Sequence, residues 1–301
     1  MCLRAKVCSE LGDDPANWPK HAPLLPPTWF SNEVTKLTEA VRAAAAGDLE
    51  KAKAQLALVR SDDLRKWVAD HGEHTGYLRA KHFAKKSKNT NESVVDRSRQ
   101  ASSLQEKLVY KRDGYRCRYC SSRLIPGIVL KAFSRVIGGD SFGITGTRQQ
   151  HHGAAVSIRA CADHVVPHAR GGRTNVENLV TACWPCNFAK AGYAVEEIGI
   201  QDPRLRPPQP SDDWDGLMSL FPELQKRLHE VTKKSTAKPS LHSVNREGTP
   251  KGVGGVSIVL LHSWLTEWEQ NSRKPPESWT PFRVNFFERN LETIREQTKK
   301  L

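Results

Sequence analysis

Two short cysteine pairs constrain the fold of this chain more than any other feature. Both have the spacing Cys-x-x-Cys, 62 residues separate them, and they comprise Cys117, Cys120, Cys183 and Cys186. Each pair makes a tight turn that directs two sulfurs to one centre, so together they can supply four thiolates to one tetrahedral Zn(II). Closing the long spacer costs only about 1 kcal/mol more than closing a usual one, whereas structural zinc contributes on the order of 10 kcal/mol. We therefore predict one structural zinc site; the alternative is two unrelated pairs of buried thiols.

The other cysteines and the hydropathy pattern favour a soluble cytoplasmic protein. The total of seven cysteines is odd, and in a reducing compartment such pairs favour metal over disulfides. Cys161 is expected to be a packed free thiol, and Cys2 and Cys8 suggest no role. The N-terminus lacks an apolar run of signal-peptide length, and no stretch is apolar enough to span a membrane.

The charge of the chain indicates a polyanionic partner. Its net charge is +13, and an excess of this size favours nucleic acid through counterion release. Residues 78–118 alone hold twelve cationic side chains against four carboxylates. We interpret this segment as a phosphate-contacting surface, with Lys85 and Lys86 among its candidate contacts; a solvated helical face is the alternative.

Composition changes along the chain predict four regions. These are a proline-rich arm over 1–27, a basic helical domain over 28–104, a domain over 105–200 with an insert at 121–160, and a C-terminal helical region over 201–301 with a mobile loop at 232–255. The glycine-rich insert is expected to form a β-hairpin or a loop. Its histidines, His151 and His152, are expected to be an exposed pair rather than metal ligands.

Capping residues predict three helices in the first half of the chain. Asn32, Asp48 and Ser61 each precede an apolar stripe of helical period and can cap its start. Gly47 and Gly72 follow the first and third stripes, where a helix is expected to end. Further helices are expected around 214–231 and beyond 258.

Most candidate catalytic and metal-binding residues lie between residues 161 and 192. Asp163 and His164 begin the run DHVVP, which predicts a strand; neighbouring strand side chains point to opposite faces, so both can reach one site only through a local twist or bulge. A Gly-Gly turn follows, then Asn178 before a leucine. Asn175 nearby is expected to be a turn residue or a cap. Asn187 comes directly after the second cysteine pair.

This combination of D-H-x-x-P, Gly-Gly, N-L and C-x-x-C-N-x-x-K resembles the HNH nucleases, the ββα-metal class, over roughly residues 105–195. The resemblance implies an α+β fold in which a ββα-metal core with structural zinc is flanked by mainly helical regions. It implies that Asp163 binds a divalent ion and that His164 is the general base. It further implies that Asn178 orients that histidine and pins the loop, and that Asn187 is a second metal ligand. An amide oxygen suits Mg(II) or Mn(II).

The function that follows is metal-dependent hydrolysis of DNA phosphodiester bonds, by nicking or cleavage, in a bacterial defence or restriction-type effector. Double-stranded DNA is the expected substrate in preference to single strands or RNA. Arg112, Arg170 and Lys190 are further candidate phosphate contacts. Because the base must be neutral, activity is expected to rise with pH through roughly 6–7. There are two alternatives. One is a nucleic-acid-binding module that zinc holds together and that has no catalytic activity. The other is a nuclease subunit whose activity is controlled by a protein partner in a defence assembly.

Overall fold

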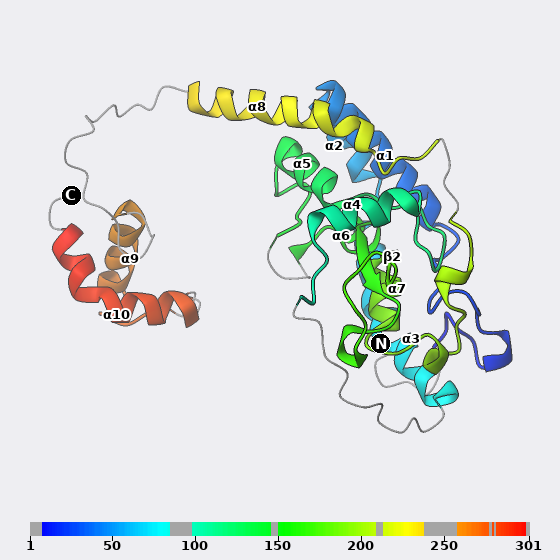
Figure 1. Cartoon of the computed structure of the whole chain (residues 1–301). Coiled ribbons are helices and arrows are strands. Elements are labelled where there is room, and N and C mark those ends of the chain that lie inside the picture. The colour runs from blue at the N-terminus through cyan, green and yellow to red at the C-terminus, as the bar shows by residue number, and fades with distance from the viewer. Residues whose placement is uncertain are drawn as a thin grey trace. The chain divides into compact units, whose positions relative to one another are not determined.

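The computed structural model describes residues 8–84, 98–145, 150–208, 213–237, 258–276, 279 and 281–298. The chain divides into two compact units, Met1–Ala237 and Lys238–Leu301 (Figure 1). The elements of the first are α1 (Phe30–Ala46), α2 (Leu49–Ala57), α3 (Ser61–Phe83), α4 (Ser103–Arg112), α5 (Gly127–Ile137), α6 (Gly153–Ser157), β1 (Ala160–His164), β2 (Leu179–Cys183), α7 (Trp184–Lys190) and α8 (Phe221–Ala237). Those of the second are α9 (Ile258–Gln270) and α10 (Pro281–Thr298). Over these ranges, no helix has both the length and the apolar character needed to cross a membrane.

The turn between α1 and α2 agrees with the prediction from the sequence. Gly47 ends α1 with a left-handed φ of 91°, a conformation that glycine adopts without steric cost. The Asp48 side chain caps α2 by accepting a hydrogen bond from the amide of Lys51 at 3.0 Å. The predicted start at Asn32 is wrong, because α1 begins at Phe30, whose 2% exposed ring extends the apolar face of the helix into the core.

Helix α3 runs to Phe83, so the predicted end at Gly72 is wrong. Neither Gly72 nor Gly76 ends the helix, and Gly76 allows a close approach of α7. A Cβ added to Gly76 would lie 1.8 Å from the carbonyl oxygen of Ala189 on α7. Ser61 does not cap α3 either, since its hydroxyl accepts a hydrogen bond from the amide of Gly153 at 2.8 Å and so ties α3 to α6.

The insert at 121–160 folds into α5 and α6, not into the predicted hairpin or loop. Its apolar side chains recur at helical spacing, and Phe133 and Phe142 are fully buried with ring centroids 5.1 Å apart. The two histidines are half-buried rather than exposed. The ring of His152 caps α6 by accepting a hydrogen bond from the amide of Ala154, and burial lowers the pKa of His152 to about 4.

Residues 8–27 are packed against α3 rather than extended as a free arm. Arg79 on α3 is fully buried and donates hydrogen bonds to the carbonyl oxygens of Pro19, Pro23 and Ile198 at 2.7–3.1 Å. Burial lowers its pKa to about 10, so the side chain remains a cation at neutral pH. Arg79, a member of the basic segment, therefore stabilises the fold and is not exposed to a ligand.

The C-terminal half contains helices, as predicted, but the expected boundary at 200/201 does not coincide with the division between the units. Helix α8 packs on α5 and α1 within the first unit. In the second unit, α9 and α10 pack through a small apolar cluster that includes Trp264, Trp268 and Phe287. Of the loop predicted over 232–255, residues up to Ala237 belong to α8 and the remainder lies outside the described residues.

Candidate active site

A strand pair and a short helix form the frame of the candidate site. β1 and β2 are antiparallel, with Asp163 opposite Val180 and His164 opposite Leu179. β2 passes directly into α7 at Cys183, whose sulfur accepts a hydrogen bond from the amide of Cys186 at 3.4 Å. In Figure 1, α4 crosses beside this ββα element. The predicted α+β class with a ββα core is confirmed.

The two cysteine pairs meet in one cluster, as predicted. The four Sγ atoms lie within 4.8 Å of one another, and those of Cys120 and Cys183 are 3.8 Å apart. A tetrahedron with Zn–S bonds of about 2.3 Å has edges of about 3.8 Å, so the cluster can hold a structural metal such as zinc. Hydrogen bonds from the other thiols hold the pKa of Cys120 well below its usual range, whereas burial raises the pKa of Cys183. Metal binding would displace the remaining thiol protons.

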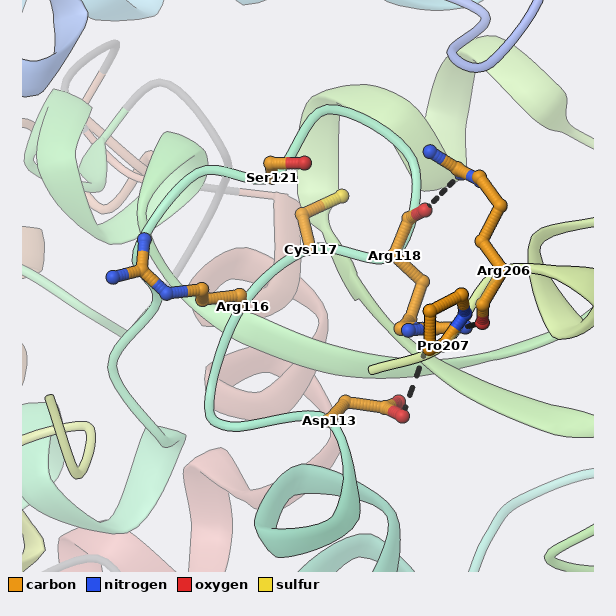
Figure 2. Close-up of a pocket in the computed structure, with 7 residues that line it drawn as sticks. All are labelled: Asp113, Arg116, Cys117, Arg118, Ser121, Arg206 and Pro207. Atoms are coloured by element: carbon orange, nitrogen blue, oxygen red, sulfur yellow. Dashed lines mark hydrogen bonds and ion pairs between the residues drawn. The ribbon is translucent and has the colours of Figure 1, made fainter. Parts of the chain in front are cut away.

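A buried carboxylate anchors the first cysteine pair to the strands. Asp113 is 1% exposed and accepts hydrogen bonds from Arg112 at 2.8 Å and from the amide of Thr181 at 2.7 Å. Figure 2 shows the cavity of about 180 Å³ beside this anchor, where Arg118 and Arg206 bond to each other's carbonyl oxygens and Arg116 points away from them. Arg112, predicted to contact phosphate, is exposed, and its guanidinium bonds to Asp113 and to the carbonyl oxygens of Val176 and Leu179.

A larger cavity, of about 570 Å³, collects the predicted catalytic side chains. Its walls include Asp163 and His164 from the end of β1, and Asn187 from α7. Both side chains line this cavity although they are consecutive residues at the end of β1. The cavity is also lined by Arg99 and Arg159. Neither was singled out from the sequence, although Arg99 belongs to the basic segment and Arg159 immediately precedes β1.

Asp163 forms the buried end of this cavity. It is 5% exposed, and its carboxylate accepts hydrogen bonds from the Tyr119 hydroxyl at 2.6 Å and from the Lys190 ammonium at 3.4 Å. Burial raises the pKa of Asp163, and Lys190 and Tyr119 oppose that rise. Lys190 is itself 1% exposed and also donates to the carbonyl oxygen of His164 at 2.7 Å. Lys190 is therefore a buried counter-charge, not a cation on the surface.

The hydrogen bonds of His164 define its tautomer. Its Nε2 lies 2.9 Å from the Thr174 hydroxyl oxygen, and that hydroxyl donates to the carbonyl oxygen of Ser98. The Thr174 oxygen is thus the acceptor toward His164, and Nε2 carries the proton. In this tautomer of the neutral ring the lone pair is on Nδ1.

Asn178 holds the loop that follows His164. Its side-chain amide accepts a hydrogen bond from the amide of Val166 at 2.9 Å and donates to the carbonyl oxygens of Val166 and Arg173 at 3.0 and 2.9 Å. The chain approaches itself closely here, because a Cβ on Gly172 would lie 1.8 Å from the carbonyl oxygen of Val166. Asn178 therefore fixes the backbone two residues beyond His164.

The remaining predicted phosphate contacts have other neighbours. Arg170 pairs with Glu197 at 2.7 Å and donates to the carbonyl oxygen of Gly192 at 3.1 Å. Lys85 and Lys86 lie outside the described residues. Arg99 and Arg159 are the arginines that line the cavity of Asp163 and His164.

The comparison with protein families agrees with this geometry. Residues 156–191 match the family model described as HNH endonuclease. The matched segment contains β1, β2 and α7, and with them Asp163, His164, Asn187 and the second cysteine pair. This chain therefore carries an HNH endonuclease domain, which supports nuclease activity of the HNH type and binding to nucleic acid. No curated protein and no solved structure matches the chain.

Proposed function

We propose that this protein is a metal-dependent endonuclease that hydrolyses phosphodiester bonds in DNA, by nicking or cleavage. The observation that carries the proposal is the convergence of Asp163, His164 and Asn187 on one cavity, over a ββα element whose helix begins at a four-thiol cluster. A nucleic-acid-binding module without turnover would need none of these three side chains at one point.

The donor set of the cavity fits a hard divalent ion. Asp163 offers a carboxylate oxygen whose contact with Lys190 is long, at 3.4 Å, and the half-buried Asn187 offers an amide oxygen from α7. Mg(II) and Mn(II) favour such oxygen ligands and retain several waters. When bound, the ion would supply stabilisation of the negative charge that develops on the phosphate oxygens.

In this proposal His164 is the general base. Its Nδ1 takes the proton from the attacking water, while the Thr174 hydroxyl keeps the ring oriented through Nε2. Asn178 holds the following loop, so the ring stays above the cavity. Because only the neutral ring accepts a proton, activity rises with pH through roughly 6–7.

The substrate we propose is double-stranded DNA, in a bacterial defence or restriction-type effector. Arg99 and Arg159 at the cavity are suited to contact phosphates, and a net charge of +13 favours a polyanion. The helices outside the HNH segment offer surface for a protein partner of such an assembly. Nuclease activity that arises only when a partner protein is added would show that the partner controls the nuclease.

The test is incubation of the full chain with supercoiled plasmid and Mg(II) or Mn(II). His164→Ala is the inactive variant, and His229→Ala, an exposed histidine on α8, is the matched control. Wild type and the control should convert the plasmid to nicked or linear product, and His164→Ala should not. Equal turnover by the wild type and His164→Ala would refute the assignment of the base, and RNA cleavage without DNA cleavage would refute the substrate.

A further inference from the structure

A second cavity, of about 460 Å³, adjoins the catalytic one. Glu106 and Arg159 belong to the walls of both. The second cavity lies between α4, the start of α5 and the start of α8, which neighbour one another in Figure 1. Its aromatic and apolar lining consists of Tyr110, Tyr115, Pro126, Ile128, Met218 and Phe221. A cavity of this size and lining is typical of ligand sites.

The aromatic wall is held in place by the surrounding backbone. Tyr115 has a left-handed φ of 53°, and its carbonyl oxygen accepts a hydrogen bond from the Trp214 indole at 3.2 Å. A Cβ on Gly216 would lie 2.6 Å from the Tyr115 ring, so the ring packs directly on glycine backbone. Tyr110 is fixed by a hydrogen bond from its hydroxyl to the carbonyl oxygen of Ala160 at 3.4 Å. The wall is therefore preformed rather than collapsed.

The rim of this cavity is cationic. Lys107 and Lys131 are exposed, and neither forms an ion pair with any residue that the structure describes. The Arg159 guanidinium lies over the Trp184 ring at 5.3 Å. Glu106 is the single acidic residue of the lining. A purely apolar ligand would not need three cations beside an aromatic wall, whereas a nucleotide carries both a flat ring and a phosphate.

The strand β1 connects the two cavities. Ala160 at its start lines the second cavity, and His164 at its end lines the catalytic one. Four residues of a strand span about 13 Å, which is the rise of about four stacked nucleotides. One nucleic-acid strand can therefore place a phosphate at His164 and a base at the second cavity.

We propose that the second cavity binds an unstacked nucleobase of the strand to be cut, with Lys107 and Lys131 on the flanking phosphates. This inference rests on the proposed nuclease function and defines its substrate class more closely. Extruding a base from a duplex costs stacking and pairing energy, least when the base has no partner. Substrates with an unpaired base near the cut should consequently bind more tightly than fully paired ones.

The test measures binding without turnover, by fluorescence anisotropy of the full chain carrying His164→Ala in Mg(II). Two labelled DNA duplexes are compared that are identical except for one position: one is fully paired and the other contains a single extra, unpaired thymidine. The unpaired form should bind about tenfold more tightly, the scale of stacking one base on aromatic side chains. Phe221→Ala should reduce this preference below about threefold.

Ile128→Glu and Tyr77→Ala complete the set. Ile128 is 50% exposed, so the substitution puts a negative charge on the rim without disturbing the core, and it should also abolish the preference. Tyr77, an aromatic side chain on α3 that is 56% exposed, is outside the cavity, and Tyr77→Ala should retain it. Equal affinity for the two duplexes, or a preference unchanged in Phe221→Ala and Ile128→Glu, would overturn the proposal.

The same measurements separate this proposal from the nuclease assignment. If the chain prefers the duplex with the unpaired thymidine but the wild type cuts no DNA, the nucleobase-binding cavity is supported and the nuclease function is refuted. If the wild type cuts DNA but shows no binding preference, the nuclease function is supported and the nucleobase-binding cavity is refuted.

Discussion

Replacing Gly76 by alanine is expected to displace the helix that carries Asn187. An added Cβ at Gly76 would lie 1.8 Å from the carbonyl oxygen of Ala189 and 2.9 Å from its carbonyl carbon. Cβ atoms essentially never approach a neighbour closer than 3.0 Å, so the two helices must separate by about 1.2 Å at this point. α7 has only seven residues, so the shift reaches Asn187, two positions before Ala189.

The size of the effect follows from two opposing contributions. Forced separation of a well-packed contact costs about 1–3 kcal/mol, while alanine in a helix interior gains about 0.5–1 kcal/mol over glycine. We expect Gly76→Ala to lower the free energy of unfolding by about 1–2 kcal/mol. Moving a ligand of the reacting centre by about 1 Å should reduce turnover by about 100-fold.

Gly72, one turn earlier on α3, is the matched control. Its added Cβ would lie 3.7 Å from the Cβ of Phe188, which is ordinary contact. Gly72→Ala should therefore raise the free energy of unfolding by about 0.5–1 kcal/mol and leave activity unchanged. Urea unfolding and plasmid nicking measure the two quantities, and zinc content checks that the cysteine cluster is intact. If Gly76→Ala were as stable and as active as Gly72→Ala, the argument from close helix packing would be refuted.

Three further predictions concern the histidine partner, the cysteine cluster and pH. Thr174→Val removes the acceptor for His164 and should lower kcat about tenfold or more with folding retained, while Thr174→Ser restores it; equal kcat for both would contradict the positioning role. Cys183→Ala should release zinc and lower the Tm, whereas Cys161→Ala keeps the metal, as measured by elemental analysis and thermal unfolding. The pKa of His152 is about 4 when folded against 6.5 ordinarily, so its neutral form stabilises the fold above about pH 6.5. This contribution, up to about 3 kcal/mol, is lost as pH falls toward 4; His152→Asn should flatten that part of a urea stability profile, and a parallel profile would argue against it.

Local chemistry made the core of the site predictable from the sequence. Each cysteine pair has its geometry built into its spacing, and Asn187 follows Cys186 directly, so its place one turn into α7 follows from the chain itself. The same holds for Gly47 and Asp48, where a left-handed residue and a capping carboxylate act within one turn. In these places the residues that decide the structure are adjacent in the chain, and the sequence was sufficient.

Tertiary contacts decided the features that the sequence did not predict. Gly72 resembles a helix end, yet α3 continues because its glycine face packs on α7. Arg112 and Lys190 resemble phosphate contacts, yet each finds a buried carboxylate, Asp113 and Asp163 respectively. Asp163 lies 27 residues before Lys190, and Arg112 also donates to the carbonyl oxygens of Val176 and Leu179, 64 and 67 residues later in the chain. Residue order alone does not reveal such partners.

The buried Lys190 side chain fixes the position of α7 relative to β1. Its ammonium joins the Asp163 carboxylate and the His164 carbonyl oxygen of β1 to the end of α7, while the start of α7 is held by the cysteine cluster. Separating α7 from β1 would leave the charge of Lys190 or Asp163 buried without its partner, which typically costs about 3–5 kcal/mol. Asp163 and Asn187 are thus placed before any nucleic acid arrives, whereas the Thr174 partner of His164 lies in the loop that follows β1. The hydrogen bonds of Asn178 and the close approach at Gly172 restrain that loop, while strand pairing with Leu179 places His164 itself, so the proposed base is also preorganised on folding.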